Sequence, residues 1–307
     1  MSWEQRQVAA HLGDAYQIVR ELGRGAMGVV FLARDIALHR LVAIKVLREE
    51  LTGHEEHHER FRREARMTAR LSHPNIIPVH TFGEIGDFVF IVMKYVHGES
   101  LAARIRRDGA LSSAECGKTL HELAQTLDYA HREGVVHRDL KAENILLERG
   151  TNRPMLTDFG VALLRSLDPG RDDAAQYGTP HYMSPEQAAG EQDLDGRSDL
   201  YSLGVLGYYM ATGKLPFHAP TFEALAAQHI AGDHEPVRTV APELGESVAS
   251  AIETCLVKER EGRWRNGREL AEFLASDRRP RGGLARVVRR FASAAAAIVL
   301  AGLGVAG

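Results

Sequence analysis

The order of apolar and polar positions divides the chain into a strand-rich first third and a mostly helical remainder. Short apolar runs typical of strands cover residues 16–22, 29–34, 41–47, 79–86 and 88–96. From about residue 99 onward, apolar residues instead recur at spacings of three and four, as in residues 113–134. The pattern predicts an α+β protein in which the strands come first.

One segment of the helical part departs from this pattern. Residues 135–147 read VVHRDLKAENILL, with six polar or charged residues between two apolar runs. Apolar flanks indicate a segment held in a core, where charges are costly unless they are paired or used in chemistry. The segment is therefore a candidate functional loop.

Composition narrows the class of protein. The 307 residues are 44% apolar and 26% charged, as in ordinary globular proteins, and they suffice for one large domain or two lobes. The two cysteines, Cys116 and Cys255, lie far apart, which excludes a disulfide framework and favours a reducing compartment. We expect both to be small buried hydrophobic residues.

Charge is distributed unevenly along the chain. The last thirty residues contain six arginines and no acidic residue, and without them 32 basic residues face 41 acidic ones, a net charge of −9 for residues 1–277. An acidic body without a basic stripe argues against nucleic acid as the main partner. The N-terminus shows no basic-then-apolar leader, so we expect the body of the protein in the cytoplasm.

The C-terminal end combines a basic segment, residues 278–290, with an uncharged one, residues 291–307. As a helix, the 17 uncharged residues would reach about 25 Å, less than the ~30 Å hydrocarbon core of a bilayer. We expect a single membrane span, with the arginines holding the body on the cytoplasmic side of the cell membrane. A small apolar helix or a disordered end is the alternative.

A G-x-G-x-x-G pattern occupies Gly23, Gly25 and Gly28. Dinucleotide-binding folds use the same spacing, but there the loop opens a helix. Strand-like residues on both sides favour instead a hairpin whose backbone N–H groups cover a phosphate chain, and an ordinary glycine-rich hairpin is the alternative. Lys45, 17 residues after Gly28 in an apolar run, supports the phosphate site, and Glu64 is a suitable partner for its ammonium group.

Together with the glycine loop, four further motifs resemble those of protein kinases in order and approximate spacing: VAIK at 42–45, HRDLKAEN at 137–144, DFG at 158–160 and SPE at 184–186. The sequences GRGAMGVVFLA and GTPHYMSPEQ are most similar to those of bacterial eukaryotic-like (Hanks-type) serine/threonine protein kinases. The resemblance covers residues 16 to about 275. It implies a two-lobed protein kinase fold with a β-rich N-lobe and a mainly helical C-lobe.

The resemblance also implies roles for the charged residues of the candidate loop. Asp139 would accept or orient the proton of a substrate hydroxyl group, and Lys141 would neutralise charge on the transferred phosphoryl group. Asn144 and Asp158 would hold Mg²⁺, for which Mn²⁺ could substitute. A lysine two residues after the aspartate resembles the serine/threonine class and not the tyrosine class.

Nucleotide-binding and structural positions follow from the same resemblance. Lys45 and Glu64 would orient the phosphates of ATP, and a gatekeeper followed by a hinge would meet adenine. The implied ATP-binding residues are Gly23, Arg24, Gly25, Gly28, Val30, Ala43, Lys45, Met93, Tyr95 and Val96. The implied structural features are His137 near the DFG turn, Asp199 behind the loop backbone, a buried Glu186–Arg263 pair, and the flanks Val135–Val136 and Ile145–Leu147 as short strands.

The segment between DFG and SPE departs from the family pattern. Relatives often place phosphorylatable threonines a few residues before the position of Gly178-Thr179, where this chain has Asp172 and Asp173. An aspartate is negatively charged without modification, and Arg138 is available to pair with it. We hypothesise that activity depends less on phosphorylation of this segment; a solvated acidic loop is the alternative.

Other function classes fit less well. A pseudokinase scaffold or ATP-binding interaction module is the main alternative, but Lys45, Asp139, Asn144 and Asp158 are all present. A small-molecule phosphotransferase is disfavoured by the intact GTPHYMSPE segment. HEEHH at residues 54–58 fits the zinc-protease pattern H-E-x-x-H, but it lies in a polar run without the apolar face that a core helix needs.

These observations predict an N-terminal extension at residues 1–15 and a kinase domain at residues 16–277, followed by the basic and membrane segments. Within the domain we expect an N-lobe at 16–92, a hinge at 93–98 and a C-lobe at 99–277. The substrates would be serine and threonine hydroxyls of proteins, phosphorylated from ATP in a signalling role. The resemblance leaves open a homodimer formed through the β-rich lobes.

Overall fold

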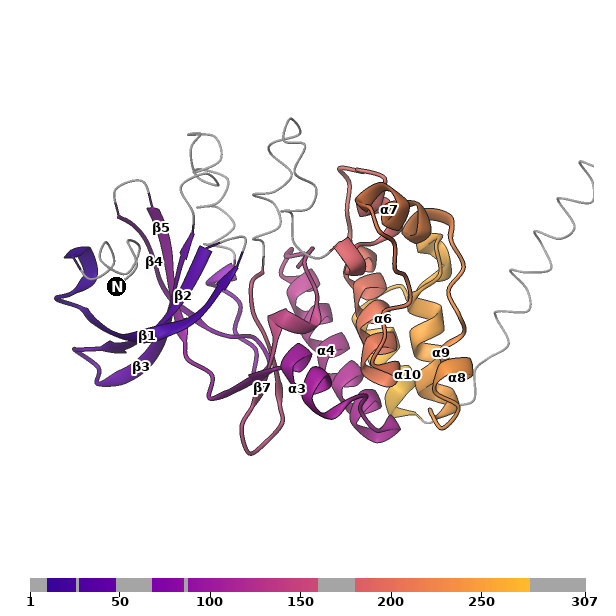
Figure 1. The fold of residues 1–307 in the computed structure, drawn as a ribbon, viewed down its shortest axis with the longest axis horizontal. Coiled ribbons are helices and arrows are strands. Elements are labelled where there is room, and N and C mark those ends of the chain that lie inside the picture. Colours follow the sequence, from indigo (N-terminus) through magenta and orange to yellow (C-terminus); the bar gives the residue numbers. More distant parts are fainter. Residues whose placement is uncertain (1–9, 26–27, 48–67, 86–87, 160–179, 277–307) are drawn as a thin grey trace, which may run out of the picture.

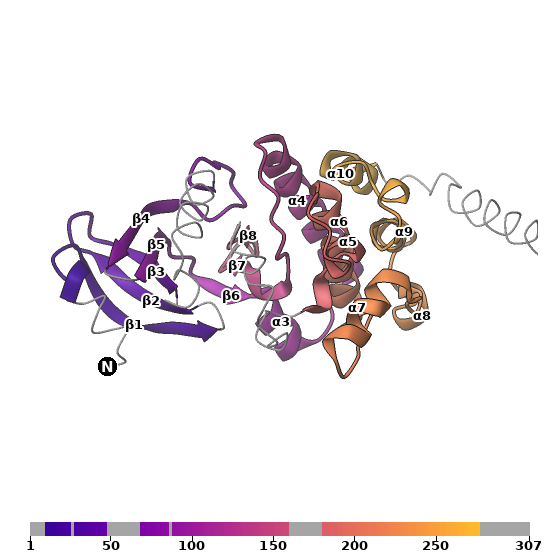
Figure 2. The same cartoon turned by 90° about the horizontal axis from the view of Figure 1, so that it is seen from above.

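The computed structural model describes residues 10–25, 28–47, 68–85, 88–159 and 180–276. These residues form two lobes, a five-stranded sheet followed by a helical lobe (Figure 1). Seen from above, a small three-stranded sheet lies between them (Figure 2). The predicted α+β order, with strands first and helices after, is confirmed.

The N-terminal sheet is antiparallel and has the order β1-β2-β3-β5-β4. Its strands are β1 (Tyr16–Gly25), β2 (Gly28–Asp35), β3 (Arg40–Leu47), β4 (Val79–Ile85) and β5 (Phe88–Lys94). Successive side chains of a strand point to opposite faces, so the apolar residues divide between two clusters. Val42 and Ile44 pack on one face, whereas Ala43 packs on the other together with Met155, which lies outside this sheet.

The helical lobe is built around α6 (Gly196–Thr212), which is buried on nearly all sides. Helices α4 (Ser113–Arg132) and α9 (Glu246–Cys255) pack against α6, and α10 (Gly267–Ala275) packs against both of them. The remaining elements are α3 (Leu101–Asp108), α5 (Pro185–Ala188), α7 (Phe222–Ala231), α8 (Val237–Val240) and the 3-10 turns η2 (Ala142–Asn144), η5 (Pro180–Tyr182) and η6 (Arg260–Gly262). A capping box of Ser112 and Glu115 begins α4, because each side chain accepts a hydrogen bond from the other residue's backbone N–H.

The small sheet joins the two lobes. It contains β6 (Gly98–Ser100), β7 (Ile145–Glu148) and β8 (Pro154–Leu156), all antiparallel. Leu156 also forms a bridge with Ile76, and its carbonyl accepts a hydrogen bond of 2.9 Å from the N–H of Ile77. The segment that leads into β4 is therefore attached to the small sheet beside the candidate loop.

The glycine pattern forms a hairpin, as predicted. Gly25 pairs with Gly28 across β1 and β2, and the element that follows the loop is the strand β2, not a helix. Gly28 has a φ of 142°, and a Cβ atom there would lie 1.9 Å from the carbonyl oxygen of Val46. Only glycine fits this position, and the helix that the dinucleotide-binding alternative requires after the loop is not formed.

One strand prediction is wrong. Residues 145–147 belong to β7 as expected, but Val135–Val136 forms no strand in the described part of the chain. The N–H of Val135 donates to Ala130 O at the end of α4, and the next amides, of His137 and Arg138, donate to a carboxylate. Three of the backbone donors that strand pairing could have used are thus taken by other acceptors.

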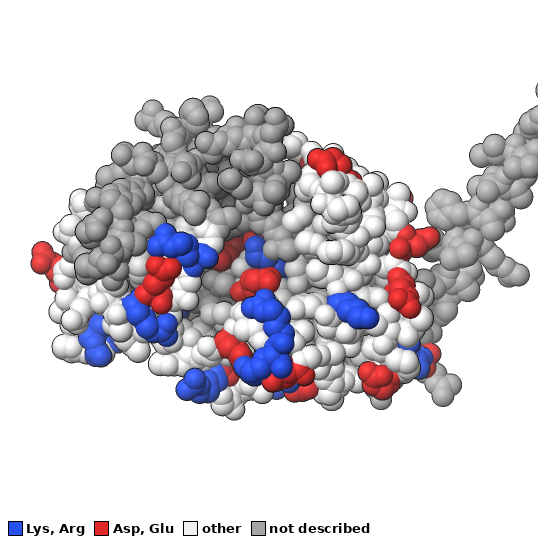
Figure 3. All heavy atoms as spheres, in the orientation of Figure 1, with Lys and Arg blue, Asp and Glu red and all other residues white. Residues whose placement is uncertain are grey.

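Several predictions concern single residues or the C-terminal end. Cys116 and Cys255 are buried thiols, and burial raises the pKa of each to about 12, so both are the small hydrophobic residues expected. Within the described ranges, no helix is long and apolar enough to cross a membrane. The HEEHH motif and the membrane segment 291–307 lie outside those ranges. On the face shown in Figure 3, acidic and basic side chains alternate without a broad patch of one sign.

Candidate active site

The charged residues of the candidate loop contact one another. Lys141 Nζ lies 2.8 Å from Asp139 Oδ2, and each side chain is 11% exposed. Asn144 Nδ2 donates to Asp139 O at 2.8 Å and to Asp139 Oδ2 at 3.2 Å. Asn144 stands at the end of η2, directly before β7, so the strand holds it in place. The three predicted side chains therefore form one group.

A second ion pair, next to this group, joins the two lobes. Lys45 of β3 donates to Asp158 Oδ1 at 2.7 Å, with the two side chains 7% and 20% exposed. Burial by itself would raise the pKa of Asp158, but the charge and the hydrogen bond of the Lys45 ammonium group, with a smaller contribution from the charge of Lys141, hold that pKa below its ordinary value. Asp158 is therefore an ionised carboxylate. The expected partner Glu64 lies outside the described residues.

His137 connects the loop to the residues around Asp158. Its Nε2 donates to Thr157 O at 2.8 Å, and its Nδ1 accepts from the N–H of Asp139 at 3.2 Å. Its ring packs on Phe159, with ring centroids 4.6 Å apart. These contacts define the neutral Nε2–H tautomer and confirm the predicted structural role of His137.

The carboxylate of Asp199 holds the loop backbone from behind. It accepts hydrogen bonds of 2.8 Å from the N–H groups of His137 and Arg138 and one of 2.7 Å from His131 Nε2. Burial would raise the pKa of Asp199, but the hydrogen bonds from His131 and from the His137 amide outweigh this, so the pKa is lowered. The predicted role of Asp199 is confirmed, and His131 is a further member that pattern analysis missed.

Two residues of the site have a left-handed backbone, Arg138 and Asp158, each with a φ of 65°. Residues other than glycine rarely adopt this region, at a cost of about 1–3 kcal/mol each. At Arg138 the contacts described for Asp199 stabilise the conformation. Such strain is typical of sites where the exact direction of a side chain matters.

Apolar residues of both lobes meet beside the Lys45–Asp158 pair. The predicted residues Val30, Ala43, Met93 and Val96 belong to one cluster. The cluster also contains Leu22 of β1, Leu146 of β7 and Met155 of β8, which sequence analysis did not assign to the nucleotide site. The short apolar runs of β7 and β8 could have suggested the last two, but only the fold shows that they pack in one cluster with the N-terminal sheet. This surface could pack against a flat apolar group such as a nucleobase.

The remaining predicted ATP-binding residues lie at the edge of this surface. Gly23 and Gly25 are at the end of β1, where an added Cβ would meet no atom within 4 Å. Between them, Arg24 forms an exposed ion pair of 3.0 Å with Glu21 of the same strand. Tyr95 is half-buried after β5, and its ring packs edge-on against His97 at 4.6 Å. Asp172 and Asp173 lie outside the described residues.

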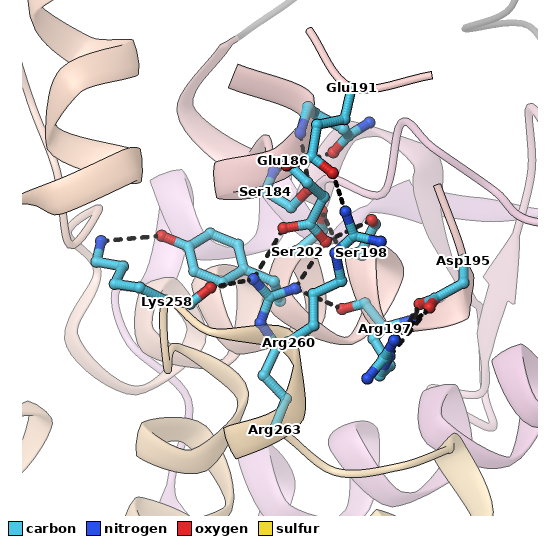
Figure 4. Close-up of polar contacts among 12 residues, drawn as sticks. Ser184, Glu186, Glu191, Asp195, Arg197, Ser198, Ser202, Lys258, Arg260 and Arg263 are labelled. Atoms are coloured by element: carbon cyan, nitrogen blue, oxygen red, sulfur yellow. Dashed lines mark hydrogen bonds and ion pairs between the residues drawn. The ribbon is translucent and has the colours of Figure 1, made fainter. Parts of the chain in front are cut away.

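The predicted Glu186–Arg263 pair is buried and bidentate (Figure 4). Arg263 donates to both carboxylate oxygens of Glu186 at 2.8 Å, and Ser198 Oγ adds a hydrogen bond of 2.6 Å. The other guanidinium donors reach backbone carbonyl groups of Val257, Arg197 and Lys258. Burial would raise the pKa of Glu186, but these partners lower it, so the pair is ionised. It ties α5 to the loop before α10.

The donor set of the site fits one kind of metal ion. No cluster of three or more His, Cys, Asp or Glu in the described part of the chain could hold a metal by itself. Asp158 supplies a carboxylate, and Asn144 directs its Nδ2 to Asp139, which leaves its Oδ1 as a ligand. Mg²⁺ prefers oxygen ligands and is often completed by water and substrate phosphates. The two residues fit a divalent cation that arrives with a nucleotide.

Comparison with known proteins agrees with this geometry. The family model described as protein kinase domain matches residues 16–272. The chain is 39% identical over 277 residues to the serine/threonine-protein kinase PknA of Mycobacterium tuberculosis, covering 89% of this chain and 63% of PknA. It is 38% identical over 272 residues to the serine/threonine-protein kinase pkn2 of Myxococcus xanthus, covering 86% of this chain and 32% of pkn2. The chain thus spans less than two thirds of the length of these relatives.

A solved structure gives the same result. The crystal structure of the Mycobacterium tuberculosis PknI kinase domain matches with a TM-score of 0.69 and 28% sequence identity, over 86% of this chain and 96% of that one. The order of strands and helices, the paired charges between the lobes and the sequence similarity lead to one conclusion: the chain belongs to the protein kinase family.

Proposed function

We propose that the protein is a serine/threonine protein kinase that transfers the γ-phosphoryl group of ATP to hydroxyl groups of proteins. The observation that carries this proposal is the constellation of Asp139, Lys141 and Asn144 beside the Lys45–Asp158 pair. The names of the relatives and the lysine at position 141 support the serine/threonine class.

In this reaction the substrate hydroxyl oxygen forms a bond to the γ-phosphorus, the bond to the leaving ADP oxygen breaks, and the hydroxyl proton leaves. Asp139 orients that hydroxyl group and accepts its proton. Lys141, 2.8 Å from Asp139, balances the negative charge on the transferred group. Lys45 binds phosphate oxygens, and the hairpin of Gly23, Gly25 and Gly28 covers the phosphate chain.

Binding of ATP uses the apolar cluster of both lobes. Adenine packs between Val30 and Ala43 on one side and Leu146 on the other, and Met93, Tyr95 and Val96 follow its edge. Asn144 and Asp158 hold Mg²⁺, or Mn²⁺ in its place. When bound, the cation neutralises the charge of the phosphates.

A pseudokinase scaffold is not favoured. Such a protein needs the fold but no catalytic arrangement, whereas Lys45, Asp139, Asn144 and Asp158 are all present, with paired side chains that are buried or partly buried. Because lone buried charges are costly, a scaffold would gain nothing from retaining this group.

We further propose the organisation of the whole chain: an extension at residues 1–15, a kinase domain at 16–277 and a basic segment at 278–290 before an anchor at 291–307. The family match over residues 16–272 supports the domain boundaries. The six arginines next to an uncharged stretch support the anchor.

Phosphate transfer from labelled ATP tests the proposed function. The 307-residue chain with Mg²⁺ should label itself or a generic basic protein on serine or threonine, as identified after acid hydrolysis. Asp139→Asn should lower the rate by about 100-fold or more because it removes the proton acceptor, while ATP binding persists. Asp193→Asn, at an exposed carboxylate far from the loop in sequence, is the control and should retain activity. ATP binding without any transfer by the parent chain would contradict the proposal.

A further inference from the structure

Gln187 is the third residue of α5, and its side chain has partners on two different elements. Its Oε1 accepts a hydrogen bond of 3.0 Å from the N–H of Ser184, and its backbone N–H donates to Ser184 Oγ at 3.3 Å. These two bonds form the capping box of α5. The Nε2 of the same amide donates to the carbonyl oxygen of Arg138 at 2.9 Å. This third bond has no part in the cap and crosses to the candidate loop.

The carbonyl group of Arg138 belongs to the peptide unit that carries Asp139. The N–H of that peptide unit donates to His137 Nδ1 at 3.2 Å. Gln187 and His137 therefore hold opposite edges of one peptide plane. Because that plane leads directly to the Cα atom of Asp139, its orientation sets the direction of the carboxylate.

Arg138 itself has the left-handed φ of 65°, which is costly without external support. Asp199 Oδ1 accepts from its N–H at 2.8 Å, and Gln187 donates to its carbonyl group at 2.9 Å. The two bonds approach Arg138 from different parts of the lobe, α6 and α5. Loss of either one would release one side of a strained residue.

The helix end that bears Gln187 is itself anchored. The neighbouring residue Glu186 makes the buried bidentate pair with Arg263, and Ser184 is fully buried (Figure 4). Because α5 is held in place in this way, the side chain of Gln187 can fix the position of the Arg138 carbonyl group. An amide on an exposed loop could not do so.

We propose that Gln187 is a positioning residue for phosphate transfer: it links docked α5 to the Arg138–Asp139 peptide and so orients the Asp139 carboxylate. The inference rests on the proposed kinase activity and deepens it. It assigns to the residue after the SPE motif a role that the cap alone does not require.

Glutamate at position 187 separates the two roles. A glutamate serves a capping box as well as glutamine, because only an acceptor for the Ser184 N–H is needed. It cannot donate to Arg138 O, where two oxygen acceptors would face each other. Gln187→Met removes the donor without that repulsion but also removes the acceptor for the Ser184 N–H. Ser184→Ala weakens the cap while the link to Arg138 stays.

The experiment compares these three variants with the parent 307-residue chain. We expect Gln187→Glu and Gln187→Met to lower kcat for phosphate transfer about tenfold or more, with the KM for ATP changed less than twofold. Ser184→Ala should instead lower the thermal midpoint and leave kcat within about twofold. Gln187→Glu keeps the acceptor of the cap, so any fall in its thermal midpoint reports the lost link to Arg138 and not the cap.

Hydrogen exchange of the backbone at residues 137–140 gives a second readout that needs no activity. Exchange at the Asp139 amide should be faster in both Gln187 variants than in the parent or in Ser184→Ala. If both Gln187 variants match the parent in kcat and in exchange, Gln187 is a helix cap only and the inference is overturned. If the parent transfers no phosphate, the proposed function fails, and the exchange rates alone still decide whether the link exists.

Discussion

At the scale of single residues, the stability of the fold depends on a few buried charged side chains whose hydrogen-bonding groups all have partners. Arg263 is the clearest case, since its guanidinium group donates to both oxygens of Glu186 and to three backbone carbonyl groups. A buried ion pair adds little net stability compared with apolar residues of similar shape, but loss of one member leaves a buried charge without a partner.

Arg263→Met should therefore lower the free energy of unfolding by about 3–5 kcal/mol, measured by urea denaturation. The matched control is Arg265→Met, which removes an ion pair between the 83% exposed Arg265 side chain and Glu269 and should cost no more than about 1 kcal/mol. The double variant Glu186→Gln, Arg263→Met should recover part of the loss because no charge remains buried. Equal effects of the two single arginine variants would contradict this account.

The motifs at this scale were readable from the sequence because each charged residue was unusual in its place. Lys45, Asp139 and Asp158 stood in apolar surroundings, where unpaired charge is costly. Their partners were not all readable. The contact of Lys45 with Asp158, 113 residues away, was not predicted. The suggested partner Glu64 lies outside the described residues. His131 and Gln187 gave no signal, since each looks like an ordinary polar helix residue.

At the scale of elements, the packing of α6 against α4 places the carboxylate of Asp199 next to the backbone of the candidate loop. Gly196, the first residue of α6, lies against His131 near the end of α4, and an added Cβ would lie 2.4 Å from His131 Nδ1. This close approach lets His131 reach Asp199, which in turn holds the backbone of His137 and Arg138.

Gly196→Ala should displace the His131 ring, lower the free energy of unfolding by about 1–3 kcal/mol and reduce phosphate transfer. Denaturation and kinetics measure the two effects. Gly117→Ala within α4 is the control, since its Cβ would meet only a methyl group of Val248 at 3.0 Å and alanine favours a helix. Full activity and full stability of Gly196→Ala would show that the contact is not needed.

The elements themselves were largely predictable. Alternating apolar residues located the strands of the N-terminal sheet, and three-four spacing located α4. The wrong strand prediction at Val135–Val136 has a specific cause. An apolar pair is typical of a strand, but the N–H groups of His137 and Arg138, which follow it, donate to the carboxylate of Asp199 from α6. A local sequence pattern cannot predict an acceptor so far away in the chain.

At the scale of the whole molecule, stability should depend on pH through a buried histidine far from the site in sequence. His229 of α7 is fully buried, and its Nδ1 lies 3.1 Å from the hydroxyl oxygen of Tyr201 of α6, which also accepts from Lys258 at 3.4 Å. Burial, with the charge of Lys258, lowers the pKa of His229 to about 3.

The sign of the effect follows from this lowered pKa. Below about pH 6.5 the unfolded chain binds a proton at His229 that the folded chain does not, so the free energy of unfolding falls as the pH decreases towards 3. The contribution reaches about 1.4 kcal/mol per pH unit. Denaturation of the parent and of His229→Gln between pH 7 and 4 measures it: the difference between the two curves should shrink or reverse as the pH falls. Parallel curves would mean that His229 titrates normally in the folded protein.

The sequence by itself determined the fold class, the order of the elements and the residues that could perform phosphate chemistry. These features are local, because backbone propensity and residue type act within a few positions of the chain. Only the tertiary structure decided which residues meet. The Lys45–Asp158 pair, the support of Arg138 by Asp199 and Gln187, and the apolar surface shared by Ala43 and Leu146 each join segments far apart in sequence. Hydrogen bonds and van der Waals contacts act over only a few ångströms, so such pairs are set by how the elements pack and not by how their residues are spaced along the chain.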